Sequence, residues 1–509
     1  MTLPGEISGM MLSDLLIEQW LPAAVADVQV SGLCLDHRRL MKGDLFLAIP
    51  GQVHDGRKFI AEAIHMGAAA VVKEQESEED VIAWQGQVPI IPAVNLAQNL
   101  GAIGSRFFKD PSARLSLVGV TGTNGKSTCS HLIAQIYQRL GTQAAVMGTL
   151  GYGCVSQESF VVDKLTETGL TTSDAISNQA ILAELNGKGA DLVAMEVSSH
   201  ALEQDRVTTL HFDSAIFTNL TRDHLDYHGS MENYALAKQK LFTMAGLKHR
   251  IVNIDDPWGA KLANSPINEA YTWTYSVNND QADLYVQSVD FHEHGIDVKL
   301  GGRWGEAQLH SKLIGQFNLQ NLLAVITTCC ARGHDLSAVI NAAKNLLPVS
   351  GRMERISSTS DVSVVVDYAH TPDSLQQVLV ALRPHTRNRL WCVFGCGGDR
   401  DKGKRPLMAQ IAEKFADKII VTSDNPRTEN AAAIIEDIKA GFKNLEPVTV
   451  ISDRAEAIKR CIAGAHDGDC VVIAGKGHED YQLIGNNKLP FSDMKQARVA
   501  LRLREQGKH

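Results

Sequence analysis

Residues 114–128 constrain the fold more than any other stretch of the chain, and they read Arg-Leu-Ser-Leu-Val-Gly-Val-Thr-Gly-Thr-Asn-Gly-Lys-Ser-Thr. Leu115 to Val120 is typical of a short buried strand, and apolar residues at helical spacing follow Lys126. Glycines in the turn between them let backbone N–H groups converge on an anion, and a helix N-terminus adds partial positive charge. The stretch therefore predicts a phosphate-binding loop between a strand and a helix.

The order of residues in this loop is that of a nucleotide-binding P-loop. In such a loop the lysine reaches the β- and γ-phosphates of ATP, and the hydroxyl that follows it ligates Mg²⁺. The strict motif has a glycine where this sequence has Val120, so the loop is a variant. The predicted ATP-binding residues here are Gly122, Thr123, Asn124, Gly125, Lys126, Ser127 and Thr128.

Composition excludes several classes of protein. The net charge is −9, which argues against general nucleic-acid binding. No run of 18 apolar residues predicts a membrane span, and the N-terminus lacks the basic start of a signal peptide. The nine cysteines are scattered without zinc-ligand spacing. We therefore expect reduced thiols and a cytoplasmic protein.

The length and the alternation of strands with helices predict the fold class. A chain of 509 residues implies about three domains. We predict an α/β fold with a small N-terminal α/β domain (1–111), a central parallel-sheet ATPase domain (112–349) and a C-terminal Rossmann-like doubly wound domain (350–509). Residues 283–314 alternate differently and predict an antiparallel β insertion.

Polar clusters follow four of the five strands predicted in the C-terminal domain. They occupy residues 367–372, 395–400, 423–427 and 475–479. In open α/β sheets, ligands bind outside the carboxyl ends of the strands. The four clusters together therefore predict a ligand site at one edge of this sheet.

Single residues of the central domain suggest further chemistry. Glu196 ends an apolar strand and could hold Mg²⁺ beside the nucleotide, and His224 is a candidate second metal ligand. Lys238, in a helical stretch, has the pattern of a solvated helix lysine. Asn318 and Asn321 could hydrogen-bond a purine or cap a helix, and capping is the commoner role.

These motifs resemble the Mur ligase family, whose members are ATP-dependent amide-forming enzymes of peptidoglycan precursor synthesis. The resemblance covers all three domains and includes the loop at 121–128, 196–200, 223–226, 318–321, 367–372 and 475–479. The run Asp424-Asn-Pro-Arg427 resembles the signature of the members that add meso-diaminopimelate.

The resemblance implies a role for each matched position. Lys238 falls where the family has a carbamoylated lysine, which with Ser127, Glu196 and His224 would ligate Mg²⁺. Lys126, Glu196, His224 and Lys238 would be catalytic. Further contacts to ATP would come from Asn318, Asn321, Arg352 and Asp367.

Substrate contacts are implied in the same way. For the UDP-muramoyl dipeptide, Leu35 and His37 would meet the uridine, and the loop of Gln52, Val53 and His54 would approach the nucleotide. The muramoyl peptide would be contacted by Thr171, Thr172, Ser198, Gln204 and Arg206. His37 stands where the family usually has serine. Diaminopimelate would meet Arg400, Asp424, Asn425, Pro426, Arg427, Gly475 and Glu479. Arg427 is the residue expected to recognise the distal carboxylate of diaminopimelate, because a guanidinium binds a carboxylate bidentately.

The implied activity is ATP-dependent addition of meso-2,6-diaminopimelate to the D-glutamyl side-chain carboxylate of UDP-N-acetylmuramoyl-L-alanyl-D-glutamate through an acyl phosphate. It would belong to cell wall synthesis, and hence to cell shape and division, in a cytoplasmic monomer that uses Mg²⁺ and binds neither nucleic acid nor membrane. Three alternatives stay open: a ligase that adds L-lysine, a folate polyglutamate ligase, and a regulatory protein that hydrolyses ATP without ligation.

Overall fold

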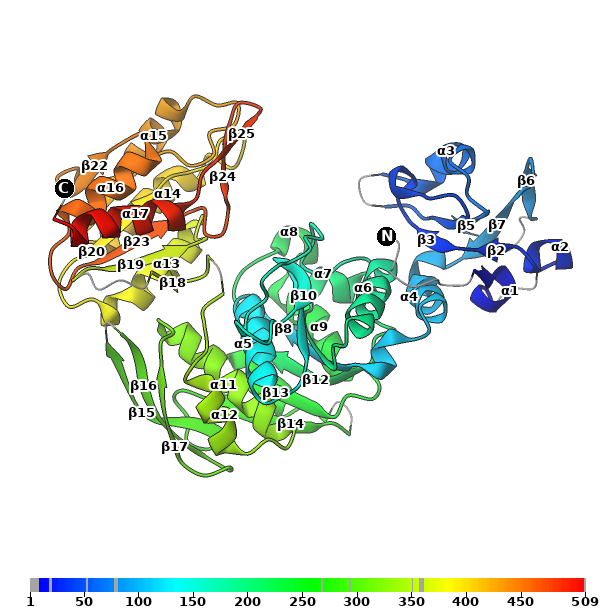
Figure 1. The fold of residues 1–509 in the computed structure, drawn as a ribbon, viewed down its shortest axis with the longest axis horizontal. Coiled ribbons are helices and arrows are strands. Elements are labelled where there is room, and N and C mark those ends of the chain that lie inside the picture. The colour runs from blue at the N-terminus through cyan, green and yellow to red at the C-terminus, as the bar shows by residue number, and fades with distance from the viewer. Residues whose placement is uncertain are drawn as a thin grey trace. The chain divides into compact units, whose positions relative to one another are not determined.

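The computed structural model describes residues 9–17, 21–51, 54–76, 81–266, 269–292, 294–349, 351–356 and 361–507. The chain forms two compact units, Met1–Trp273 and Thr274–His509, and the boundary falls within strand β14 (Tyr271–Ser276) (Figure 1). Helices and strands alternate along most of both units, which confirms the predicted α/β class. The domain boundaries at residues 111 and 349 stay predictions.

The first unit opens with a five-stranded sheet in the order β3-β4-β5-β7-β6. Its strands are β3 (Gly32–Cys34), β4 (Asp44–Ala48), β5 (Ala70–Gln75), β6 (Ala83–Gln85) and β7 (Val88–Val94), and only β6 is antiparallel to its neighbour. Short elements precede it: β1 (Met10–Met11), α1 (Leu12–Leu15), α2 (Ala23–Ala26) and β2 (Gln29–Val30). Helix α3 (Ile60–His65) follows β4, and α4 (Leu96–Phe107) follows β7. The α4 residues Leu96, Leu100, Ile103 and Phe107 are buried, as their helical spacing requires.

The main sheet of the first unit carries the phosphate loop. Its strands run in the order β10-β9-β11-β8-β12-β13. They are β8 (Ser116–Thr121), β9 (Ala144–Gly148), β10 (Gly151–Cys154), β11 (Leu192–Glu196), β12 (Phe212–Phe217) and β13 (His249–Asn253). All pairings are parallel except the β9–β10 hairpin. The apolar run of β11 is buried along its whole length, as expected for a central parallel strand.

Five helices lie between these strands along the chain, and a sixth follows β13. They are α5 (Lys126–Arg139), α6 (Ala175–Gly187), α7 (Ser199–Glu203), α8 (Leu225–His228), α9 (Met231–Gln239) and α10 (Pro257–Ala263). Because β8, β11 and β12 are parallel neighbours, the loops after their carboxyl ends meet at one edge of the sheet.

The second unit begins with the predicted antiparallel insertion, which is confirmed. Strands β15 (Leu284–His292), β16 (Gly295–Gly302) and β17 (Ala307–Ser311) pair antiparallel in chain order. Helices α11 (Gln316–Ala331) and α12 (Leu336–Ala343) follow.

The C-terminal sheet has the strand order β18-β19-β23-β20-β21-β22 and is parallel apart from β18. Its strands are β18 (Glu354–Arg355), β19 (Ser363–Asp367), β20 (Leu390–Phe394), β21 (Lys418–Val421), β22 (Val448–Val450) and β23 (Cys470–Ala474). Since β23 lies between β19 and β20, the four predicted polar clusters follow adjacent strands at one edge.

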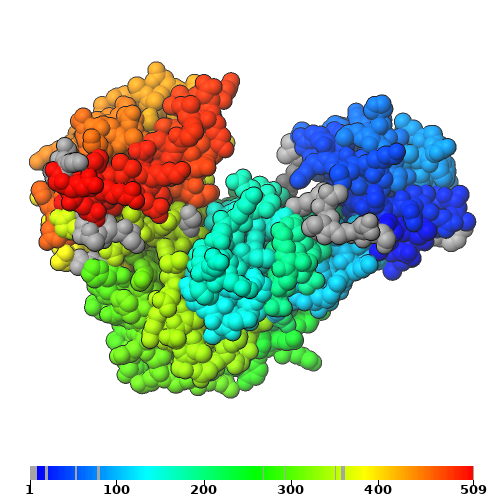
Figure 2. Space-filling view, viewed as in Figure 1, coloured from blue at the N-terminus to red at the C-terminus, as the bar shows by residue number. Residues whose placement is uncertain are grey.

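Helices cover both faces of this sheet, which makes the domain doubly wound. One face packs on α13 (Pro372–Leu382), α14 (Lys404–Phe415) and α15 (Ala431–Lys439), and the other on α16 (Arg454–Gly464) and α17 (Asp493–Glu505). The atoms of α17, in red, lie at the surface of the face seen in Figure 2. A hairpin of β24 (Tyr481–Ile484) and β25 (Asn487–Pro490) joins β23 to α17.

All nine cysteines are free and none forms a disulfide, as the sequence predicts. Among the described residues, no helix has the length and apolar character needed to cross a membrane.

Candidate active site

The phosphate loop lies between β8 and α5 as predicted. Gly122 and Gly125 have φ values of 149° and 87°, a backbone region that favours glycine. A Cβ at Gly122 would lie 1.9 Å from Thr218 Oγ1, so a side chain is excluded there. Lys126 Nζ donates to Gly122 O at 2.9 Å and to Thr123 O at 2.8 Å, which folds the lysine back over the loop. The N-terminus of α5 thus faces the space where phosphate binds in such loops.

The end of β12 holds the loop from the neighbouring strand. Asn219 Oδ1 accepts a hydrogen bond from Asn124 N at 2.9 Å, and Thr218 Oγ1 donates to Asn124 O at 2.6 Å. The Tyr234 hydroxyl lies 3.2 Å from Thr123 Oγ1. Sequence reasoning missed Thr218, Asn219 and Tyr234. The signal for the first two was their position at the end of a strand that is parallel to β8.

Glu196 is buried at the carboxyl end of β11, beside Val120 of β8. Its carboxylate accepts from Thr149 N at 3.0 Å and from Thr149 Oγ1 at 3.1 Å. A Cβ at Gly148 would lie 2.1 Å from Glu196 Oε1, so glycine is required for this close approach. The described residues place no cation in an ion pair with this carboxylate. A buried carboxylate without a cationic side chain suits a site that binds a divalent cation.

The prediction that Lys238 is a solvated helix lysine is wrong. It is only 2% exposed, and Nζ donates to Gly122 O at 2.9 Å. Tyr234 covers the amine, with Nζ 4.4 Å from the ring centroid. Burial, reinforced by the charge of Lys126, lowers the pKa of Lys238 well below its ordinary value. The helical pattern of α9 could not reveal this burial, because the loop that covers the lysine lies more than a hundred residues earlier.

His224 caps α8 with a positive φ of 52° and sits in a group of aromatic rings. Its ring centroid lies 4.8 Å from that of His200 and 6.0 Å from that of Tyr234. Burial and the neighbouring histidines lower the pKa of His200, which favours the neutral form of that ring. Tyr234 also touches the phosphate loop and Lys238, so this group adjoins both. Ser127, Glu196 and His224 offer hydroxyl, carboxylate and imidazole donors, a set that fits Mg²⁺ only with further oxygen ligands.

The five residues matched to the muramoyl peptide, at positions 171, 172, 198, 204 and 206, form one connected network. Thr172 Oγ1 donates to Glu196 O at 2.9 Å and accepts from Ser198 N at 3.0 Å. Arg206 donates from Nη1 to Thr172 O at 3.0 Å and from Nη2 to Gln204. Thr149 Oγ1 extends the network to the Thr171 hydroxyl at 3.0 Å.

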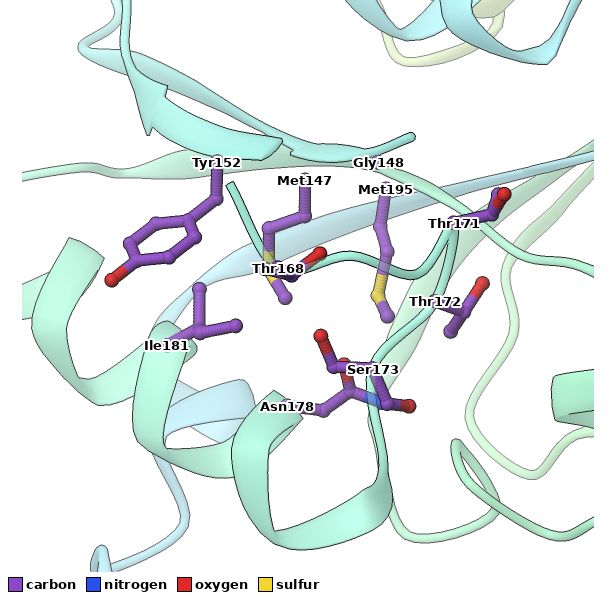
Figure 3. A pocket seen from close by; sticks show the side chains of 10 residues that line it. All are labelled: Met147, Gly148, Tyr152, Thr168, Thr171, Thr172, Ser173, Asn178, Ile181 and Met195. Carbon is purple, nitrogen blue, oxygen red and sulfur yellow. The ribbon is translucent and has the colours of Figure 1, made fainter. Parts of the chain in front are cut away.

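A small pocket of about 10 Å³ lies against this network, with room for about one water molecule (Figure 3). Its lining residues are Met147, Gly148, Tyr152, Thr168, Thr171, Thr172, Ser173, Asn178, Ile181 and Met195. Two predicted substrate contacts, Thr171 and Thr172, therefore share this small cavity with two methionine side chains and the buried Asn178.

The predicted uridine contacts lie in the N-terminal sheet region. The His37 ring stacks on Phe59, with centroids 4.3 Å apart and planes 15° apart. Leu35 is partly buried, and His54 is exposed. Gln52 and Val53 lie outside the described residues.

The remaining predicted ATP contacts lie in the second unit. Asn318 does not cap α11, because Gly315 occupies the cap position and Asn318 Nδ2 instead donates to Ile314 O at 2.8 Å. Asn321 Nδ2 donates to Asn318 Oδ1 at 3.3 Å. Asp367 ends β19, and burial raises the pKa of its carboxyl group. The Arg352 guanidinium lies over the Tyr368 ring, 5.1 Å from its centroid.

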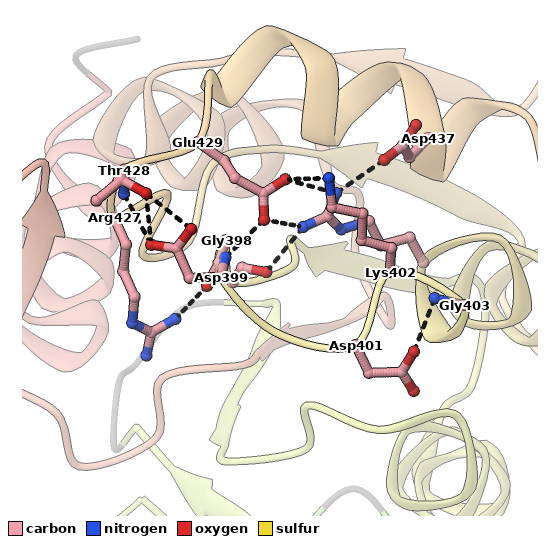
Figure 4. A network of polar contacts seen from close by, with 11 residues as sticks. Gly398, Asp399, Asp401, Lys402, Gly403, Arg427, Thr428, Glu429 and Asp437 are labelled. Carbon is pink, nitrogen blue, oxygen red and sulfur yellow. Dashed lines mark hydrogen bonds and ion pairs between the residues drawn. The ribbon is translucent and has the colours of Figure 1, made fainter.

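The residues matched to diaminopimelate gather at the carboxyl edge of the C-terminal sheet, and Figure 4 shows one of them, Arg427, with its hydrogen bond to Gly398. Arg427 has a positive φ of 50°, and Nη1 donates to Gly398 O at 2.8 Å. A Cβ at Gly397 would lie 2.9 Å from Arg427 Nη1 and 3.9 Å from Arg400 Cγ, so both arginines flank this glycine.

The neighbouring loops complete this cluster. Asn425 Nδ2 donates to Glu479 Oε2 at 2.9 Å, and the buried Lys476 donates to Asn425 Oδ1 at 3.0 Å and to Glu479 Oε2 at 2.8 Å. A Cβ at Gly475 would lie 2.5 Å from Asp424 Oδ2. The structure thus brings together the residues at 400, 424–427, 475 and 479. Sequence reasoning did not single out Lys476, which donates hydrogen bonds to two of these residues, Asn425 and Glu479.

A parallel sheet with a glycine-rich phosphate loop at its carboxyl edge, and a buried carboxylate on the next strand, defines a nucleotide-binding α/β protein of the P-loop class. The chain belongs to the Mur ligase family. Models of the family match in sequence order: "Mur ligase family, catalytic domain" at residues 29–108, "Mur ligase middle domain" at 120–329 and "Mur ligase, glutamate ligase domain" at 351–477.

Relatives of known sequence and structure agree with this assignment. A Haemophilus influenzae protein named UDP-N-acetylmuramoyl-L-alanyl-D-glutamate--2,6-diaminopimelate ligase is 48% identical over 481 residues, which are 93% of this chain and 96% of that one. A Pseudomonas aeruginosa protein of the same name is 48% identical over 486 residues, or 95% and 98% of the two chains. A solved structure with this name in its title has a TM-score of 0.73 at 36% identity and covers 98% of this chain and 99% of that one.

Proposed function

We propose that the chain is an ATP-dependent ligase that joins meso-2,6-diaminopimelate to the D-glutamyl side-chain carboxylate of UDP-N-acetylmuramoyl-L-alanyl-D-glutamate. The observation that carries the proposal is the gathering of Arg400, Arg427 and Glu479 at one sheet edge, in a chain 48% identical to ligases of that name. Such a ligase makes a peptidoglycan precursor, and we assign it to the cytoplasm as a monomer.

The reaction must overcome a poor leaving group, since an amine does not displace oxide from a carboxylate. A carboxylate oxygen therefore attacks the γ-phosphorus of ATP, which forms an acyl phosphate and releases ADP. The amine of diaminopimelate then adds to the acyl carbon, and the tetrahedral intermediate expels inorganic phosphate as the amide forms. The proton that the attacking amine loses as the amide forms is released to solvent.

The first step brings two anions together, so the site must supply positive charge. Lys126, in the phosphate loop, would neutralise the transferred phosphoryl group. Ser127, Glu196, His224 and a carbamoylated Lys238 would hold Mg²⁺, which when bound supplies further charge neutralisation. Positioning and electrostatics of this kind carry most of the catalysis in phosphoryl transfer.

The environment of Lys238 supports the proposed carbamoylation. The reaction forms an N–C bond between the neutral amine and CO₂ and releases a proton, so it requires an unprotonated lysine. The lowered pKa of Lys238 favours that form, and the nearby Lys126 would pair with the anionic product. The modification would turn a buried cation into a carboxylate-like ligand.

Specificity would come from Arg427. Diaminopimelate differs from lysine by one carboxylate at the far end, which a guanidinium can bind through two parallel hydrogen bonds. A site built for such a group rejects an analogue that lacks it by about 10⁴–10⁵. With lysine, the arginine would remain desolvated without its anion.

The test is ADP release measured with the UDP-muramoyl dipeptide and ATP, with and without meso-diaminopimelate or L-lysine. We expect turnover only when meso-diaminopimelate is present. Equal or greater turnover with L-lysine would identify a lysine-adding ligase instead. ATP hydrolysis at the same rate with and without either amino acid would instead indicate a regulatory protein that hydrolyses ATP without ligation.

A further inference from the structure

A fully buried ion pair lies beneath the cluster matched to diaminopimelate. Arg454 is the first residue of α16 and Asp493 the first of α17. Arg454 donates from Nε to Asp493 Oδ1 and from Nη2 to Asp493 Oδ2, each at 2.7 Å. Both side chains are 0% exposed, so neither can touch a bound amino acid.

The same guanidinium also donates to the backbone of two functional loops. Nη2 reaches Ala474 O at 2.9 Å, and Nη1 reaches Ser423 O at 3.3 Å. Ala474 directly precedes Gly475, and Ser423 directly precedes Asp424. Each carbonyl is therefore the last backbone acceptor before a segment matched to diaminopimelate.

One carbonyl belongs to the last residue of β23 and the other lies two residues after β21, and these two strands are not neighbours. Strand β20 lies between β21 and β23, so no ladder of hydrogen bonds joins β21 directly to β23. The planar guanidinium of Arg454 links the ends of these two strands by donating to both carbonyls. The space between the loops is narrow, since a Cβ at Gly475 would lie 2.5 Å from Asp424 Oδ2 and 3.8 Å from Arg454 Nη2.

We propose that Arg454 is a positioning residue for the amino-acid site: it sets the separation of the Asp424–Arg427 and Gly475–Glu479 loops, and so the placement of the groups that bind diaminopimelate. The proposal rests on the proposed function. A binding site loses affinity when its supporting groups shift by about 1 Å, so a side chain that never touches the ligand can control its KM.

Arginine is required for this role because of its shape. Its planar fork offers five donors in fixed directions, and Arg454 uses them on one carboxylate and two carbonyls. Lysine keeps the charge but has a single flexible ammonium group. Arg454→Lys therefore preserves the ion pair with Asp493 while it loosens at least one loop.

The chain offers a matched control in Arg504 of α17. Its guanidinium also binds one carboxylate bidentately, with both contacts to Asp361 at 3.0 Å, and donates to the carbonyls of Ile462 and Ala463. Those carbonyls lie at the end of α16 and not beside the matched loops. Arg504→Lys thus disturbs a similar set of bonds in the same domain without acting on the site.

The experiment measures steady-state ADP release by the full chain while each of the three substrates is varied. For Arg454→Lys we expect the KM for meso-diaminopimelate to rise at least tenfold, with the KM for ATP and for the UDP-muramoyl dipeptide within about twofold of wild type. Arg504→Lys should leave all three within about twofold. Urea denaturation of both variants separates this effect from a general loss of stability.

If Arg454→Lys does not fold, the double variant Arg454→Met with Asp493→Leu takes its place, because an apolar pair of similar volume can replace a buried ion pair without loss of stability. It removes both carbonyl contacts, so the same selective rise in KM is expected. A folded variant with an unchanged KM for meso-diaminopimelate overturns the positioning role alone. A wild-type enzyme without turnover that depends on meso-diaminopimelate overturns the proposed function and this role together.

Discussion

Replacing Lys238 with methionine tests the buried lysine beneath the phosphate loop. Methionine fills nearly the same space but has no amine, so the change removes the hydrogen bond from Nζ to Gly122 O. Such a bond contributes about 1 kcal/mol, and Gly122 O still accepts from Lys126 Nζ at 2.9 Å. We therefore expect the loss of this hydrogen bond to lower the free energy of unfolding by about 1 kcal/mol or less, apart from the pH-dependent contribution of the buried amine.

The effect on activity should be far larger than the loss of one hydrogen bond implies. Loss of one preorganised electrostatic group in an active site typically lowers the rate by about 10²–10³, and we expect that loss in the kcat for ADP release. Lys240 is the matched control, since its side chain is 45% exposed and pairs with Glu203 at 3.0 Å. Lys240→Met should change kcat by about twofold or less. Lys238→Ala, which leaves a cavity, should regain part of its activity with added short carboxylates.

The pH dependence of stability gives a second measurement. While Lys238 carries a free, unmodified amine, burial lowers its pKa, so the unfolded chain binds more protons than the folded chain between the two pKa values. The stability of the wild type relative to Lys238→Met should therefore rise with pH in that interval, by at most about 1.4 kcal/mol per pH unit. A variant with full activity and the wild-type pH dependence would show that Lys238 is an inert buried side chain.

Arg427→Ala should lower kcat/KM for meso-diaminopimelate by about 10²-fold or more, with ATP binding unchanged in calorimetry, because the carboxylate reader is lost. An unchanged kcat/KM would refute this reading. Arg405 lowers the pKa of Glu429 from 4.5 to about 2, so the stability that this carboxylate provides over Glu429→Gln should be complete above pH 4.5 and shrink as the pH falls towards 2 in urea titrations. A constant difference across that range would contradict the assignment. Burial raises the pKa of every thiol and only Cys154 is partly exposed, so mass spectrometry should find iodoacetamide on Cys154 alone before unfolding. Rapid labelling of several cysteines in the folded protein would contradict the burial of the other eight thiols.

Local sequence patterns predicted those parts of the site that short segments build by themselves. The phosphate loop needs only a strand, a glycine turn and a helix N-terminus within 15 consecutive residues. The polar runs after the C-terminal strands share one edge because parallel strands all end there. The match of Asp424–Arg427 to a known signature likewise required no knowledge of contacts.

Contacts between distant segments could not be read in this way. Helical periodicity assigned Lys238 to solvent, whereas Gly122, 116 residues away, covers its amine. Thr218 and Asn219 hold the phosphate loop across 94 or more residues, and Lys476 and Arg454 act on loops 20 to 51 residues distant.

The sequence by itself determined which segments become strands, where the anion-binding turn lies and which polar residues follow the strands, since these depend on near neighbours. Only the tertiary structure decided which side chains are buried, which pKa values shift and how one guanidinium holds two loops. Burial and electrostatic environment depend on what packs against a group, and packing joins residues that are far apart along the chain.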